Sequence, residues 1–116
     1  MKTLASLLLC SVLTGMGLAL TAQDAPKEIA ITAKRFTYEP NEVHLKKGEK
    51  VTLVLKTADV THGLLCPKLG IRGVSIKPDT ETRVQVTPAE AGTFTAICSH
   101  FCGAGHGNMK MKFVVE

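Results

Sequence analysis

The chain has 116 residues, and its 14 lysines and arginines against 10 aspartates and glutamates give a formal net charge of +4. Hydrophobic residues make up 45% of it, while tryptophan is absent and there are one tyrosine and four phenylalanines. This length allows one domain, whose core must be mainly aliphatic. The composition excludes a disordered tail, a polybasic nucleic-acid-binding protein and a membrane protein with several spans. It also disfavours an enzyme with a deep substrate cleft.

The first 22 residues have the pattern of a secretory signal. The charged residue Lys2 precedes an apolar run over 4–20, and small residues end the segment. We therefore expect a signal peptide at 1–22, a short linker at 23–27 and one domain at 28–116. That domain then lies outside the cytoplasmic membrane, in the periplasm or another exported location. An uncleaved membrane anchor is the alternative, because the apolar run is close to the length that spans a bilayer.

Short apolar or alternating segments, separated by turn residues, fill the expected domain. Strands of this kind, with turns at intervals of about 8–12 residues, are typical of a β-sandwich. No segment after the leader keeps an apolar period of about 3.6 residues, so no long helix is expected there. In the last segment apolar residues alternate with Lys110 and Lys112, which predicts one buried and one exposed face. The expected strands cover 29–33, 43–45, 51–55, 74–76, 83–87, 93–98 and 109–115.

The segment from Cys98 to Met109 contains the densest set of metal-binding side chains. It holds two thiols, an imidazole and a thioether between two expected strands. These are the soft donors that copper prefers, and two histidines, a cysteine and a weak methionine form the blue-copper pattern. The segment supplies one histidine to this pattern, His106, so a second must come from elsewhere. His62 fits, since it follows the expected strand at 51–55 and two loops at one end of a sandwich can converge on one ion.

The expected exported domain contains an odd number of cysteines, Cys66, Cys98 and Cys102. A pure disulfide framework leaves one thiol over, whereas a bound metal keeps thiols from pairing. Three readings besides two copper ions stay open: a Cys98–Cys102 disulfide, a zinc site of two cysteines and two histidines, and a single copper bound without Cys98. Cys66 is expected to be a small buried apolar residue. His44 is expected on the outer face of its strand.

Four spaced residues and an upstream group carry a resemblance to a known family: Cys98-x3-Cys102-x3-His106-x2-Met109 and Val60-x-His62-Gly63. They are similar to the CuA signature of cytochrome c oxidase subunit II, which also occurs in the C-terminal domain of nitrous-oxide reductase. The resemblance extends from about Phe36 to the final strand, nearly all of the expected domain. It implies a cupredoxin fold, an all-β Greek-key sandwich, which holds two copper ions.

The resemblance also implies a role for each residue of the site. His100 stands where subunit II usually has a glutamate, whose side chain helps to hold magnesium in the oxidases, so only its backbone carbonyl is carried over. Neither a catalytic residue nor an organic cofactor is implied. The implied ligands are bridging thiolates from Cys98 and Cys102, one histidine for each copper from His62 and His106, and weak axial donors from Met109 and the carbonyl of His100.

We therefore expect a small exported copper protein that passes single electrons between redox proteins, such as a cytochrome or a terminal oxidase, and that is not an enzyme by itself. The alternatives are an accessory or truncated subunit II-like component and a periplasmic copper chaperone or storage protein. Because tryptophan is absent and the charge is basic, the expected partner is acidic rather than a basic cytochrome. No nucleic acid is expected, and a membrane only if the leader is retained. The cations near or after the ligand segments are Lys68, Arg72, Lys110 and Lys112.

Overall fold

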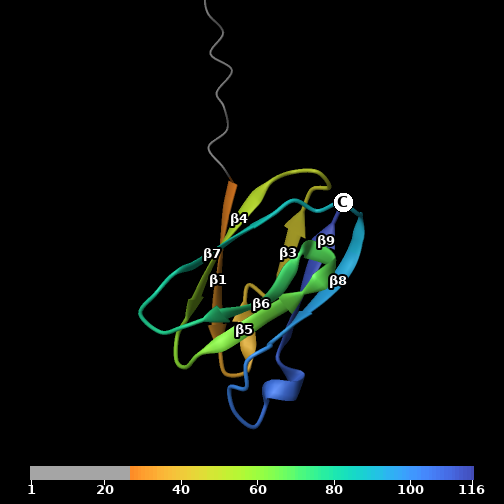
Figure 1. Ribbon diagram of the computed structural model, residues 1–116. Coiled ribbons are helices and arrows are strands. Elements are labelled where there is room, and N and C mark those ends of the chain that lie inside the picture. Colours follow the sequence, from red (N-terminus) through yellow and green to blue (C-terminus); the bar gives the residue numbers. More distant parts are fainter. Residues whose placement is uncertain (1–26) are drawn as a thin grey trace, which may run out of the picture.

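The computed structural model describes residues 27–116, which form a sandwich of two β-sheets (Figure 1). The all-β sandwich predicted from the sequence is confirmed. The predicted signal peptide at 1–22 and residues 23–26 of the predicted linker lie outside the described residues, and Lys27 is already the first residue of β1. The strands are β1 (Lys27–Lys34), β2 (Thr37–Glu39), β3 (Glu42–Leu45), β4 (Val51–Thr57), β5 (His62–Cys66), β6 (Ile71–Ile76), β7 (Thr82–Val86), β8 (Gly92–Ile97) and β9 (Lys110–Val115).

The chain crosses repeatedly from one sheet to the other. One sheet has the strand order β2-β1-β4-β7 and the other β3-β9-β8-β5-β6, so β2 and β3, β4 and β5, and β7 and β8 are consecutive strands in different sheets. The pairs β1–β4 and β3–β9 are parallel. The helical elements of residues 27–116 are two 3-10 turns, η1 (Pro67–Leu69) and η2 (His106–Asn108). Neither has the length or apolar character that a membrane-spanning helix requires.

The final strand has the two faces that its sequence predicts. Its apolar residues are almost completely buried, and the intervening Lys110 and Lys112 are exposed. Because successive side chains of a strand point to opposite faces, this alternation directs one face of β9 into the space between the sheets. The buried residues of this segment are Met109, Met111, Phe113 and Val115, with relative exposures of 1%, 2%, 0% and 3%.

Two strands, β2 and β5, were not expected from the sequence. The first has three residues, too few to show an alternating pattern. The second starts at His62 and is buried at nearly every position, so it shows no alternation, and Gly63 weakens its strand propensity. The interpretation of His62 as a loop residue was therefore wrong: it is the first residue of β5, in the sheet that also contains β8 and β9.

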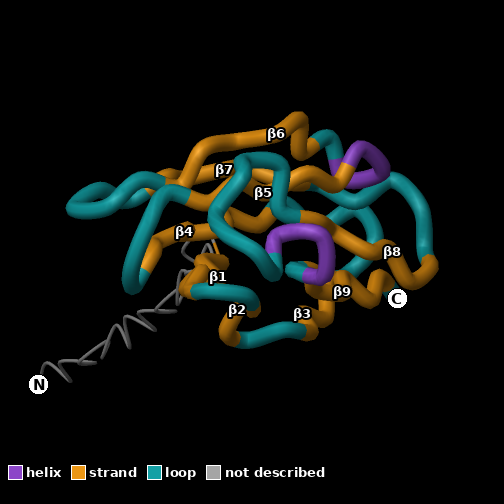
Figure 2. Tube along the Cα trace, turned by 90° about the horizontal axis from the view of Figure 1, so that it is seen from below, coloured by secondary structure: helices purple, strands orange, loops and turns teal. Residues whose placement is uncertain are grey.

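Three connections lie together at one end of the sandwich, opposite the C-terminus (Figure 1). They are the turn between β1 and β2, the loop between β4 and β5, and the long loop between β8 and β9. Figure 2 looks onto this end, where the β8–β9 loop with η2 occupies the centre of the view. The segments that carry the predicted ligands therefore meet at this end.

Candidate metal centre

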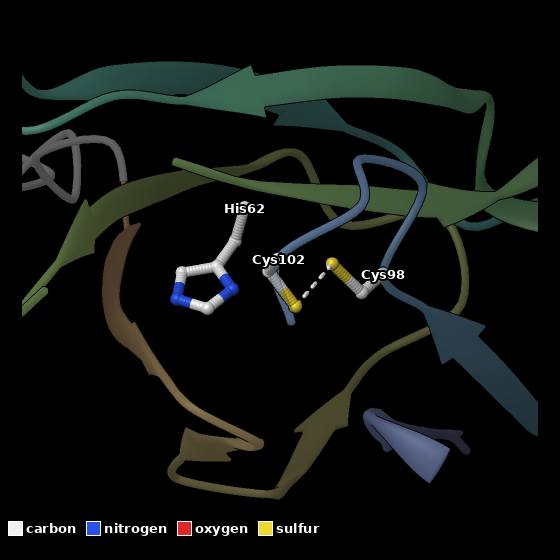
Figure 3. Close-up of side chains that lie close together, drawn as sticks. All are labelled: His62, Cys98 and Cys102. Atoms are coloured by element: carbon white, nitrogen blue, oxygen red, sulfur yellow. Dashed lines mark hydrogen bonds between the residues drawn. The ribbon is translucent and has the colours of Figure 1, made fainter. Parts of the chain in front are cut away.

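Three buried side chains form a group that could hold a metal ion: His62, Cys98 and Cys102. Their donor atoms all lie within 4.8 Å of one another. The side chains come from the start of β5 and from the two sides of the loop after β8, and their relative exposures are 0%, 4% and 5%. Figure 3 shows the imidazole of His62 with one nitrogen turned toward the two sulfur atoms. Sequence positions far apart are thus brought to one point.

The two ring nitrogens of His62 have different surroundings. Nε2 is 2.7 Å from Oδ1 of Asp59, and because a carboxylate only accepts hydrogen bonds, Nε2 carries the proton and donates it. Nδ1, the nitrogen that faces the thiols in Figure 3, is buried and has no hydrogen-bond partner in the described structure. A buried polar atom without a partner costs about 1–3 kcal/mol. A metal ion beside Nδ1 would satisfy this atom. Because the bond to Asp59 keeps the proton on Nε2, the lone pair of Nδ1 is free to bind such an ion.

Asp59 is itself fixed by the backbone around it. Its Oδ2 accepts a hydrogen bond from the backbone N–H of Arg35 at 2.8 Å, and its Oδ1 accepts one from Val60 N at 2.6 Å. Partial burial acts to raise the pKa of Asp59, but the hydrogen bonds from Arg35, His62 and Val60 outweigh it and hold that pKa well below its usual value. Asp59 therefore stays ionised over the neutral range and keeps the orientation of His62.

Cys102 contacts the remaining donors of the β8–β9 loop. Its sulfur lies 3.7 Å from Cys98 Sγ, 3.7 Å from His106 Nδ1 and 3.7 Å from Met109 Sδ. Two donors that share one tetrahedral metal, at about 2.0–2.3 Å each, lie about 3.5 Å apart. The separations in the protein are close to this value, so the side chains present fit a shared metal. The dashed line in Figure 3 marks the contact between the two thiols, and both cysteines are free.

Cys98 is held against β5. Its sulfur accepts a hydrogen bond from Gly63 N at 3.5 Å and lies 3.1 Å from the carbonyl oxygen of His100. Gly63 is required here because an added Cβ would lie 2.8 Å from the backbone nitrogen of His100. The carbonyl of Gly63 accepts a hydrogen bond of 2.5 Å from the hydroxyl of Tyr38, so both polar backbone groups of this glycine are used.

The protonation of two neighbouring groups follows from burial. Burial first, and then the neighbouring Cys98 thiol, raise the pKa of Cys102 to about 11. This thiol is therefore protonated at neutral pH without a metal, and an ion that binds it as thiolate must displace the proton. Burial and the two thiols also raise the pKa of Tyr38 well above its usual value, so that its hydroxyl remains a donor.

The predicted residues fall into distinct groups. Besides the cluster of His62, Cys98 and Cys102, the donors His106 and Met109 contact Cys102, and the carbonyl of His100 contacts Cys98. The imidazole of His100 is exposed and is 2.9 Å from the carbonyl of Phe101. Of the two residues expected to be structural, Cys66 is buried as predicted, and burial raises its pKa. The side chain of His44 is 59% exposed, also as predicted, beside Glu42 and Glu116.

Sequence reasoning missed the residues that orient the donors, Asp59 and Tyr38. The position of Asp59, three residues before His62, is the signal that could have identified it, because a ligating histidine commonly donates its second N–H to a carboxylate. No local signal identifies Tyr38, because it reaches the site across 25 residues of sequence.

Residues 4–115 match the family model of the cupredoxin-like domain. The chain belongs to the cupredoxin-like family. The periplasmic domain of subunit II of cytochrome oxidase (CoxB) of Bradyrhizobium japonicum has the same fold, with a TM-score of 0.72 and 20% identity over 79% of this chain and 85% of that one. The cupredoxin fold implied by the sequence resemblance is thus confirmed.

Two curated relatives agree with the resemblance to copper domains. Nitrous-oxide reductase of Ralstonia nicotianae is 35% identical over 92 residues, 76% of this chain and 14% of that one. Cytochrome c oxidase subunit 2 of Thermus thermophilus is 30% identical over 88 residues, 76% of this chain and 64% of that one. The chain thus spans less than two thirds of either relative. Membership of this family and the buried histidine–cysteine–cysteine group together support copper as the metal.

Replacement of Asp59 tests how His62 is oriented. Asp59→Ala removes the acceptor of the Nε2 proton, and we expect it to weaken Cu(I) binding about 10–100-fold, because the tautomer and the ring orientation are then no longer fixed. Asp59→Asn keeps an oxygen that can accept this bond and should retain most of the affinity. Competition with a colorimetric Cu(I) chelator measures both. An unchanged affinity in Asp59→Ala contradicts a role of Asp59 in metal binding.

Proposed function

We propose that this protein carries single electrons by means of a binuclear, CuA-type copper centre. The observation that carries the proposal is the pair of buried thiols 3.7 Å apart, faced by a buried imidazole nitrogen that has no other partner. One copper needs a single thiolate of this pair, whereas two thiolates are able to bridge two ions. Zinc would leave the contact between Met109 and Cys102 without a role, since thioether is a donor that copper prefers.

The donors divide into strong and weak groups. Cys98 and Cys102 would hold both ions. His62 and His106 would each hold one, because a ring nitrogen of His62 lies close to both thiols and Nδ1 of His106 contacts the sulfur of Cys102. The weak donors would be the sulfur of Met109 and the carbonyl of His100, which contact one thiol each. All these donors belong to the protein, so no coordination position is assigned to a substrate. This favours electron transfer over catalysis.

The site favours fast electron transfer through charge and rigidity. When bound, two coppers supply a centre that changes by one electron, and two thiolates reduce its net charge to about +1 when oxidised and about 0 when reduced. The protein holds the donors between strands of a close-packed sandwich, and the N–H of Cys98 donates to the carbonyl of Met109 at 3.1 Å across the base of the loop. The positions of the donors therefore change little between the two redox states.

Metal content and electron paramagnetic resonance test the binuclear centre. We expect two coppers per chain and a spectrum of one unpaired electron shared by both. Cys98→Ser should lower the content to one copper and change the colour, because it removes one bridging thiolate. The matched control is Cys66→Ala, which removes a buried cysteine outside the thiol pair and should keep two coppers. One copper, or zinc, in the parent protein overturns the proposal.

Copper storage or delivery is the second function considered, and resistance to chelators distinguishes it. His62, Cys98 and Cys102 are at most 5% exposed, which favours retention over exchange. We expect less than a tenth of the copper to be lost within an hour to a strong Cu(I) chelator in excess. Complete loss within minutes would instead indicate a delivery protein. An accessory oxidase component is distinguished by co-purification with a haem–copper oxidase.

We further propose that the protein acts outside the cytoplasmic membrane on an acidic redox partner. The location is supported by the leader pattern of the sequence and by the relative that is a periplasmic domain. The partner is supported by a row of outward-facing side chains across four strands. Its apolar centre, Leu65 and Ile97, is flanked by two cations, which form no ion pair within residues 27–116. The row runs Arg72, Leu65, Ile97, Lys110, each paired with the next.

Charge reversal tests this row, which adjoins the centre because Ile97 precedes Cys98 and Lys110 follows Met109. The double variant Arg72→Glu/Lys110→Glu should be oxidised several-fold more slowly by the anion ferricyanide at low salt, and the effect should disappear at high salt. The control Lys46→Glu/Lys47→Glu makes the same change in net charge in the turn between β3 and β4, at the other end of the sandwich. Equal slowing in both variants contradicts the proposed surface.

A further inference from the structure

Arg35 contacts the β4–β5 loop, which leads into His62, and the β8–β9 loop, which carries Cys102. It lies in the turn between β1 and β2. Its backbone N–H donates to Oδ2 of Asp59 at 2.8 Å, and its side-chain Nε donates to the backbone carbonyl of Cys102 at 3.0 Å. These partners are 24 and 67 residues away in sequence. Arg35 thus connects the β1–β2 turn to Asp59 on one side of the site and to Cys102 on the other.

The contacts of Arg35 continue directly to two donors. Asp59 passes the connection to His62, because its other oxygen accepts the Nε2 proton of the imidazole. Cys102 is itself a donor, and its position depends on the backbone whose carbonyl Arg35 holds. A continuous chain of hydrogen bonds therefore joins His62, at the start of β5, to Cys102, in the loop after β8. Such partners of ligating residues fix their orientation in metal sites.

The neighbouring Phe36 strengthens this connection by close packing. A Cβ added to Gly105 would lie 2.4 Å from Cδ2 of Phe36, and one added to Gly103 would lie 3.0 Å from the same ring. Gly103 also has a φ of +139°, which side chains other than glycine rarely adopt. The β8–β9 loop therefore passes directly over the ring of Phe36, and Arg35 holds it there by a directional bond.

Arg35 also places a permanent positive charge beside the thiols. Its guanidinium carries a positive charge, and within residues 27–116 it forms no ion pair with a carboxylate. Arg35 is itself exposed, so water screens part of its charge, but the thiols near it are buried, where charge interactions are stronger than in water. Because addition of an electron makes a metal centre more negative, a nearby cation stabilises the reduced state relative to the oxidised one.

We propose that Arg35 is a positioning residue which holds the β4–β5 and β8–β9 loops together and raises the reduction potential of the centre. The inference rests on the proposed copper site and adds a residue that contacts no metal. The backbone N–H of Arg35 is kept in every substitution except proline, so the methionine and lysine variants report on the bond to Cys102 and on the charge.

The test uses Arg35→Met, Arg35→Lys and Arg83→Met in the copper-loaded full chain. Methionine keeps a long side chain but removes the donor and the charge, and lysine restores the charge. Arg83 is the matched control, because its guanidinium contacts Glu28 and Glu81 and neither the β4–β5 loop nor the β8–β9 loop. We expect a lower reduction potential and several-fold faster copper loss to a chelator in Arg35→Met. The potential should return toward the parent value in Arg35→Lys and stay unchanged in Arg83→Met.

Hydrogen exchange of the metal-free proteins provides a readout that is independent of copper. In Arg35→Met the amides of the β8–β9 loop, such as Asn108 and Met109, should exchange several-fold faster, while those of the core strand β4 should not change. A parent potential and parent exchange rates in Arg35→Met overturn the proposal, as does an equal change in Arg83→Met. If the parent binds no copper, the proposed function fails, and the exchange rates alone decide whether Arg35 positions the loop.

Discussion

The hydrogen bond between His62 and Asp59 is the interaction on which the rest of the site depends. It assigns the proton of the imidazole to Nε2 and leaves Nδ1 as a buried acceptor that only a cation or a donor can satisfy. The sandwich brings Cys98 and Cys102 to the same point, so the unsatisfied nitrogen and two thiols face one another. The local cost of this arrangement is offset by the packing of the strands around it.

The architecture separates the support of the donors from the donors themselves. β5, β8 and β9 contribute side chains to the buried core, and His62, Cys98 and Met109 lie at the ends of these same strands, while Cys102 and His106 lie in the loop between β8 and β9. Movement of a donor at a strand end would therefore require movement of a packed strand. The exposed side of the same sheet is free to carry charge, since its side chains contribute nothing to the core. One sheet thus contributes rigidity through its buried face, and its exposed face carries the row of side chains proposed to meet the partner.

The features of the fold and the site that could be predicted from the sequence are those that depend on residues close together in the chain. The alternation around Lys110 and Lys112 and the spacing between Cys98 and Met109 are local patterns, and they predicted the last strand and most of the donor set. β5 could not be predicted, because a strand that is buried at nearly every position shows no alternation. Arg35 was also missed, since its role arises from hydrogen bonds to residues that only the folded chain brings near. Asp59 was missed although it lies only three residues before His62.

The crossing of the chain between sheets has a consequence for the order of folding. Gly63, which donates to Cys98, is 35 residues away from it in sequence, and such long-range contacts form late because the intervening loop must first be closed. Before β5 has paired with β8, His62 is not yet held beside the thiols, and residues 98–109 alone hold an ion by fewer bonds. An ion captured early therefore exchanges out readily. The metal that stays bound is therefore selected only after β5 has paired with β8, because His62 then reaches the other donors.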